Sequence, residues 1–154
     1  MLSQTAEYAL RAVLYIARGR PVAPPCSVEQ LAEALGVPRN YLSKTLHQLA
    51  RAGVLDSTRG RGGGFRLARS PERIRLIEVV RPFDDIGEGR RCLLGRGACS
   101  DRAACEAHES WKPVAERVAA YFREKTVAEV MNGGMAGRRD PRRRVSRDAS
   151  YQPP

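Results

Sequence analysis

Residues 54–68 have the sequence VLDSTRGRGGGFRLA, and this stretch decides the expected fold. Val54–Thr58 and Phe65–Ala68 each predict a short strand. The turn between them, Arg59–Gly64, contains four glycines and two arginines, so it can bend tightly while carrying positive charge. The sequence therefore predicts a β-hairpin with a basic tip.

Two short helices are predicted immediately before this hairpin. Ser27 and Gln30 form a capping box that starts the first helix, and Gly36 ends it. The second helix begins at Val37-Pro38 and stops at Gly53. Its inner face has leucines at helical spacing: Leu42, Leu46 and Leu49. Two helices joined by a short turn and followed by a hairpin are typical of a winged helix-turn-helix.

The expected fold class is mainly α with a small β-hairpin wing and a long helix after the winged domain. A first helix is expected from about Gln4 to Arg18. Its apolar face is formed by Ala6, Leu10, Val13, Leu14 and Ala17. Residues 74–83 predict the end of a strand that runs into a short helix. The residues expected to be buried there are Leu76, Ile77 and Val80.

The second half of the chain begins with a segment without helical period, residues 84–104. A long helix is expected from about Cys105 to Lys125. Its apolar stripe comprises Trp111, Val114, Val118 and Phe122. Thr126 and Glu129 form a capping box for a last short helix ending near Met131, and we expect disorder from Gly133 onward.

Positive charge is concentrated in the first half of the chain. The formal net charge is +10; residues 1–81 contain thirteen basic and six acidic side chains, whereas residues 82–131 contain eight and nine. This asymmetry favours a polyanionic partner for the first half. Solvated charge that raises solubility would explain the same numbers.

Several other classes of protein are not favoured. No apolar run approaches the roughly 20 residues that span a bilayer, and the N-terminus lacks the basic segment of a signal peptide. We therefore expect a cytoplasmic protein without a membrane partner. Four cysteines in that reducing compartment favour metal or redox chemistry over disulfides. No catalytic triad, carboxylate pair or nucleophile elbow is present, so we expect no enzyme.

The outer face of the second helix of the pair is polar. It carries Arg39, Asn40, Ser43, Lys44 and His47. A helix fits the major groove of duplex DNA, where such side chains can reach base edges or phosphates. For any one of these residues alone, simple solvation is the commoner explanation. At the hairpin tip, Arg59 and Arg61 are expected to contact phosphates or enter a narrow minor groove.

A group of possible metal ligands lies in the second half. Cys92, Cys99 and Cys105 are followed by His108, and three thiolates with an imidazole can hold zinc or an iron–sulfur cluster. Zinc sites usually contain close C-x-x-C pairs, which are absent, but the spacing alone leaves both cofactors open. Cys105 and His108 lie three residues apart at the expected helix start and should project from one face. Cys26 lies in the loop before the helix pair, far from these residues in the sequence, and is expected to be a buried or free thiol.

The chain resembles the IscR/NsrR family of winged helix-turn-helix iron–sulfur transcriptional regulators (Rrf-two type) over about residues 1–131. The motifs that carry the resemblance are Glu7-Tyr8-Ala9-Leu10-Arg11, Val37-Pro38-Arg39-Asn40-Tyr41-Leu42, Leu49-Ala50-Arg51-Ala52-Gly53-Val54-Leu55, Arg59-Gly60-Arg61-Gly62-Gly63-Gly64-Phe65-Arg66-Leu67, and the three cysteines followed by His108 and Trp111.

The resemblance implies a homodimer formed through the long helix, with Cys92, Cys99 and Cys105 as ligands of an iron–sulfur cluster. The cluster type, 2Fe–2S or 4Fe–4S, stays open because the first two cysteines are one residue further apart than in IscR. His108 matches the fourth ligand of IscR-like members. Glu7 of the partner subunit matches that of NsrR-like members, and an outside donor is the third alternative.

The expected function is sequence-specific regulation of transcription on double-stranded DNA, as a repressor, modulated by a cluster that senses nitric oxide, redox or iron status. A winged-helix regulator with structural zinc or no metal is the alternative, and a small redox or electron-transfer protein a remote one. The expected domains are 1–83 (DNA-binding), 84–105 (cluster loop), 106–131 (dimerisation helix and last short helix) and 132–154 (disordered basic tail). The operator does not carry over, because IscR-like members have an acidic residue where this chain has Ser43 and Lys44.

Overall fold

The computed structural model describes residues 2–19, 24–86, 93–94 and 101–136. Its helices are α1 (Gln4–Ala17), α2 (Val28–Leu35), α3 (Arg39–Arg51), α4 (Leu76–Val80), α5 (His108–Glu124) and α6 (Val127–Ala136), with short 3-10 turns η1 (Pro71–Arg73) and η2 (Asp101–Ala103). Two strands, β1 (Leu55–Thr58) and β2 (Gly64–Leu67), complete the described elements. The expected class, mainly helical with one hairpin, is confirmed.

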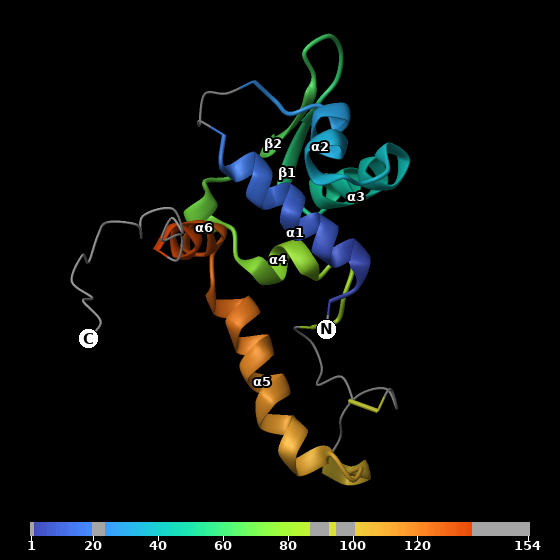
Figure 1. Cartoon of the computed structure of the whole chain (residues 1–154), viewed down its shortest axis with the longest axis vertical. Coiled ribbons are helices and arrows are strands. Elements are labelled where there is room, and N and C mark those ends of the chain that lie inside the picture. Colours follow the sequence, from blue (N-terminus) through green and yellow to red (C-terminus); the bar gives the residue numbers. More distant parts are fainter. Residues whose placement is uncertain (1, 20–23, 87–92, 95–100, 137–154) are drawn as a thin grey trace, which may run out of the picture.

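The helix pair and the hairpin form as the sequence predicts. The Ser27 hydroxyl accepts a hydrogen bond from the Gln30 amide, and the Gln30 side chain accepts one from the Ser27 amide, which completes the capping box. Gly36, at φ +65°, ends α2 in the left-handed conformation that favours glycine. β1 and β2 pair antiparallel, with Leu55 opposite Leu67. The hairpin tip stands at the top of the molecule, beside α2 (Figure 1).

Helix α1 is the central element of the core. It contacts α2, α3, α4, α6 and β2. Its buried residues are Ala6, Ala9, Ala12, Val13 and Ile16. The expected face was therefore wrong in part, because Leu10, Leu14 and Ala17 are half-buried at the edge of the core. Small alanines let neighbouring elements approach α1 closely, and this effect has no strong signal in an apolar pattern.

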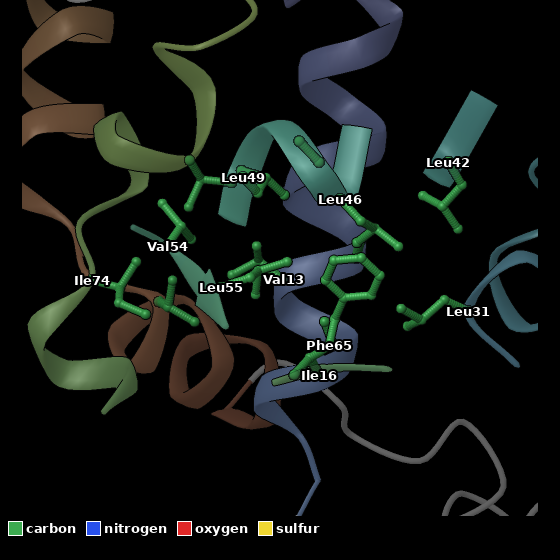
Figure 2. Packing of buried hydrophobic residues seen from close by; sticks show 14 of the residues in the cluster. Val13, Ile16, Leu31, Leu42, Leu46, Leu49, Val54, Leu55, Phe65 and Ile74 are labelled. Carbon is green, nitrogen blue, oxygen red and sulfur yellow. The ribbon is translucent and has the colours of Figure 1, made fainter. Parts of the chain in front are cut away.

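The core fixes α3 and the hairpin to α1. The three leucines expected on the inner face of α3 are fully buried, as are Val54 and, almost completely, Leu55. Figure 2 shows Phe65 of the hairpin between Ile16 of α1 and the leucines of α3. Burying a large apolar side chain contributes about 1.5–3 kcal/mol, so these few contacts hold both elements firmly.

The chain returns to the winged domain through a short backbone ladder. The Leu76 amide donates to the Lys125 carbonyl, and the Val127 amide donates to the Ile74 carbonyl, both at 2.9 Å. These bonds attach the start of α6 to the segment between η1 and α4, and α6 packs on η1 and α1. In α4, Val79 is buried, whereas Ile77, which was expected to be buried, is half-buried.

Helix α6 continues to Ala136, so the expected end near Met131 and the expected disorder at residues 133–136 are wrong. A glycine inside a helix costs only about 1 kcal/mol, which a capped and packed first turn can offset. Residues 137–154 lie outside the described residues.

Helix α5 extends away from the winged domain (Figure 1). It begins at His108 instead of Cys105. Of its expected apolar stripe, Val114 and Val118 face solvent in the single chain, 47% and 43% exposed, whereas Trp111 and Phe122 are half-buried. Tyr121, which was not expected in the stripe, is 49% exposed beside them. None of the helices in the described ranges is both long enough and apolar enough to cross a membrane.

Glu129 provides a test of how α6 is held. Its carboxylate accepts bonds from the Thr126 amide, the Lys125 ammonium and the Thr126 hydroxyl, and these lower its pKa from 4.5 to about 2. Because the ionised form is favoured in the folded state, the stabilisation is present above the unfolded pKa and is lost as the pH falls.

We predict that Glu129→Gln lowers the free energy of unfolding at neutral pH. The difference from the wild type should shrink as the pH falls from 4.5 to about 2. Urea unfolding at several pH values measures it, with Glu33→Gln, an exposed glutamate of α2, as the matched control. A difference that does not change with pH would contradict this role.

Candidate nucleic-acid interface and cysteine loop

The outer face of α3 presents the side chains that the sequence singled out. Arg39, Asn40, Lys44 and His47 are exposed, and Ser43 is half-buried. They recur at helical spacings of three and four on the side opposite the buried leucines, so one surface can present all five to a groove.

Two of these residues also have partners within the chain. The Arg39 guanidinium lies 2.6 Å from the carboxylate of Glu29 on α2, and both side chains are largely exposed. An exposed ion pair contributes at most about 1 kcal/mol, so Arg39 can exchange Glu29 for a phosphate or base. The His47 ring packs edge-on against Phe65 of β2, with 5.2 Å between ring centroids. His47 therefore also braces α3 against the hairpin.

The hairpin tip exposes Arg59 and Arg61 on a glycine-rich turn. Gly60 and Gly62 adopt φ +95° and +75°, conformations that other residues rarely take. The Gly63 amide donates to the Gly60 carbonyl at 2.9 Å and closes the turn. The glycines thus shape a narrow tip that projects two guanidinium groups.

The backbone of Cys26 supports the base of the hairpin, a role that the sequence did not reveal. Its amide donates to the Phe65 carbonyl, and its carbonyl accepts from the Phe65 amide at 2.8 Å. A Cβ atom on Gly64 would overlap this Cys26 carbonyl, which explains the glycine there. The Cys26 thiol is half-buried, and burial raises its pKa, so it remains a poor nucleophile.

The segment that leads into the cysteine loop is hydrogen-bonded to both α3 and α1. The Gln48 side-chain amide donates to the Pro82 carbonyl at 2.8 Å. The Ser3 amide donates to the carboxylate of Asp84 at 2.6 Å, and Asp84 is only 7% exposed. These partners are 34 and 81 residues apart in the chain, so no local pattern could have identified them.

Part of the expected metal site is described. Cys105 is half-buried just before α5, and its carbonyl accepts a hydrogen bond from the amide of the buried His108. The expectation that both lie within one helix is corrected, although a single turn still joins them. Cys92 and Cys99 lie outside the described residues. Among the described residues, no three His, Cys, Asp or Glu side chains are grouped closely enough to hold a metal ion.

The surroundings of His108 fit a ligand role. Its Nε2 lies 2.8 Å from Asp101, whose same oxygen accepts a hydrogen bond from Lys112 at 2.9 Å. In a neutral ring, a carboxylate on one nitrogen favours the tautomer with the proton on that atom, and many metal-binding histidines have such a carboxylate partner. Glu7, the other expected fourth ligand, is exposed in the first turn of α1.

Comparisons with known proteins agree with this architecture. Residues 2–133 match the Rrf2 family model, described as an iron-dependent transcriptional regulator. An Aquifex aeolicus protein named as an HTH-type transcriptional regulator is 32% identical over 86% of this chain and 92% of its own. The regulator IscR of Klebsiella pneumoniae is 28% identical over 85% of this chain and 79% of its own.

Among solved structures, CymR, the global cysteine regulator of Bacillus subtilis, has the same fold. Its TM-score is 0.66 at 20% identity, covering 86% of this chain and 97% of CymR. The range that matches the family model, residues 2–133, includes the helix pair, the hairpin and α5. The chain thus belongs to the Rrf2 family of DNA-binding, helix-turn-helix transcriptional regulators.

Proposed function

We propose that this regulator is a cytoplasmic, homodimeric, sequence-specific repressor whose affinity for DNA depends on an iron–sulfur cluster in the loop at residues 84–105. The observation that carries the proposal is the attachment of residues 82–84 to both α3 and α1. Through these bonds, a change in the loop can alter the position of the element that reads DNA.

In this proposal, residues 1–83 form the DNA-binding domain. Arg39, Asn40, Ser43, Lys44 and His47 lie on the surface of α3 that would enter the major groove. Arg59 and Arg61 would hold the neighbouring phosphates or enter the minor groove. Arg39 and Asn40 on α3 can make paired hydrogen bonds to bases, whereas the tip arginines supply affinity that does not depend on sequence.

Helix α5, within residues 106–131, would form the dimer. Its exposed Val114, Val118 and Tyr121 recur at spacings of four and three and therefore form one apolar stripe. Such a stripe on a helix that extends from its domain favours pairing with the same stripe of a second copy. Dimerisation would place two DNA-reading surfaces in a fixed geometry for a two-fold symmetric operator.

Cys92, Cys99 and Cys105 would hold the cluster, with His108 or Glu7 of the partner subunit as the fourth ligand. When bound, a cluster supplies an inorganic centre that reacts with nitric oxide and oxidants and depends on iron supply. Asp101 would orient His108, and Lys112 would fix Asp101. IscR among the relatives favours this cofactor. Because CymR, a cysteine regulator, has the same fold, a regulator with structural zinc or no metal is the second candidate.

Hydrogen bonds at the start of the cluster loop would connect the loop to the DNA-binding helix α3. Gln48 holds Pro82 at the end of α3, and Ser3 holds Asp84 while its hydroxyl caps α1. If the loop reorders after losing its ligand bonds, these hydrogen bonds would shift or break. The populations of DNA-competent and incompetent positions of α3 would then change.

We predict that replacing Arg59 and Arg61 by Ala weakens binding to all duplexes by a similar factor. The slope of log affinity against log salt should fall by about one unit for each phosphate contact that is lost. Fluorescence anisotropy at several salt concentrations measures both quantities. Arg73→Ala, an exposed arginine of η1, is the matched control, and equal losses for the control would contradict the assignment.

Purification without air from iron-replete cells tests the cofactor. We predict iron, acid-labile sulfide and visible absorption, all lost in Cys99→Ser and kept in Cys26→Ser, because only the former removes a thiolate ligand. The loaded and cluster-free proteins should bind operator DNA with different affinities. A colourless, iron-free wild type would contradict the cluster, and bound zinc in it would favour the second candidate.

The link itself is tested by Gln48→Ala. This change removes the hydrogen bond to Pro82 without touching a proposed ligand or a base-reading residue. We predict that the cluster content is unchanged, whereas the ratio of DNA affinities of loaded and cluster-free protein moves toward one. An unchanged ratio in a variant with normal cluster content would show that the signal takes another route.

A further inference from the structure

A shallow pocket of about 450 Å³ lies where the N-terminal half of α1 meets the start of α3. It is lined by Gln4, Tyr8, Pro38, Asn40, Tyr41 and Lys44. None of these residues is acidic, and every polar side chain among them can donate a hydrogen bond. Lys44 adds a positive charge, so the pocket is suited to an anion.

The two tyrosines of the pocket are held in place by neighbours. Their rings pack edge to face, with 5.8 Å between centroids. The Gln4 amide donates to the Tyr8 hydroxyl oxygen at 3.0 Å, which leaves the Tyr8 hydroxyl proton to be donated to a ligand. The Tyr41 hydroxyl is hydrogen-bonded to the Thr5 hydroxyl.

Two further groups make the potential here more positive. The Arg11 guanidinium carbon lies 5.8 Å from the centroid of the Tyr8 ring. Pro38 occupies the N-cap of the 13-residue helix α3, which therefore has no side-chain cap. The partial positive charge of this helix end adds to that of Lys44.

We propose that the pocket binds a phosphodiester group of duplex DNA beside α3, so that Gln4 and Tyr8 of α1 join the interface. The inference rests on the proposed DNA-binding function and deepens it. From the sequence, Lys44 could contact either a base or a phosphate. Because Lys44 lines this pocket, we assign its contact to the phosphate. A backbone contact on this side would fix the height and angle of α3 over the groove.

Gln4→Glu tests the pocket with almost no change in shape. The new carboxylate would repel a phosphate, yet acidic residues are favourable in the first turn of a helix, so α1 should fold normally. We predict a loss of affinity of about tenfold or more, similar for all duplexes, and a smaller uniform loss for Tyr8→Phe. Lys44→Met should also act uniformly and lower the salt slope by about one unit.

Matched controls lie elsewhere on the surface. Asn132→Asp on α6 makes the same change of charge, and Tyr15→Phe removes an exposed tyrosine hydroxyl outside the pocket. Both should bind DNA as the wild type does. If Gln4→Glu and Tyr8→Phe bind like these controls, or if the pocket variants change which sequences are preferred, the phosphate assignment is wrong. A wild type that binds no duplex would instead refute the proposed function.

NMR of reductively methylated lysines distinguishes a phosphate group of DNA from a free phosphate ion as the anion in the pocket. The chain has three, Lys44, Lys112 and Lys125. We predict that a duplex shifts the Lys44 signal in the wild type and shifts it less in Gln4→Glu. A Lys44 signal that responds to inorganic phosphate, combined with unchanged DNA affinity of Gln4→Glu, would show a site for a free anion and overturn the assignment to DNA.

Discussion

The structure depends on the close packing of α1 against its neighbours. Ala6, Ala9 and Ala12 are completely buried, and only side chains of this size let so many elements approach one helix. As a result, α3, the hairpin and the segment that leads to the cysteine loop are all positioned relative to α1. A larger residue at any of these positions would move the elements apart, at a cost of typically 1–3 kcal/mol.

This arrangement places the basic surface and the start of the cysteine loop around one small core. The exposed side of α3 and the hairpin tip carry the basic surface, while the leucines of α3 hold that helix on α1. Residues 82–84 contact the end of α3 and the start of α1. In the proposed function, a signal from the loop would therefore need no long pathway to α3, because the loop begins beside α3 and the start of α1.

The sequence predicted the winged domain well, because its signals are local. The capping box at Ser27 and Gln30, the end of α2 at Gly36 and the glycine-rich turn after Thr58 each act within a few residues. The face of α1 was only partly predicted, since alanines are weakly apolar and their burial depends on neighbours. The extent of α6 was missed because its two glycines indicate an end, whereas the capped and packed start of the helix lets it continue.

Some residues of the candidate site could likewise be identified from the sequence, and others could not. The polar face of α3 follows from helical spacing, so Asn40 and Lys44 could be identified in advance. The pocket residues Gln4 and Tyr8 could not, because α1 meets α3 only in the folded chain. Likewise, Asp101 has no sequence signal as a partner of His108, since a 3-10 turn and a loop bring the two together.

If residues 82–84 join the loop to α3, the cluster must affect backbone opening in α3 itself. Amide hydrogen exchange of the anaerobic protein, with and without its cluster, measures this directly. The proposed link predicts faster exchange after cluster removal in the last turns of α3 and the first turn of α1, in addition to the loop. A change confined to residues 84–108 would contradict it.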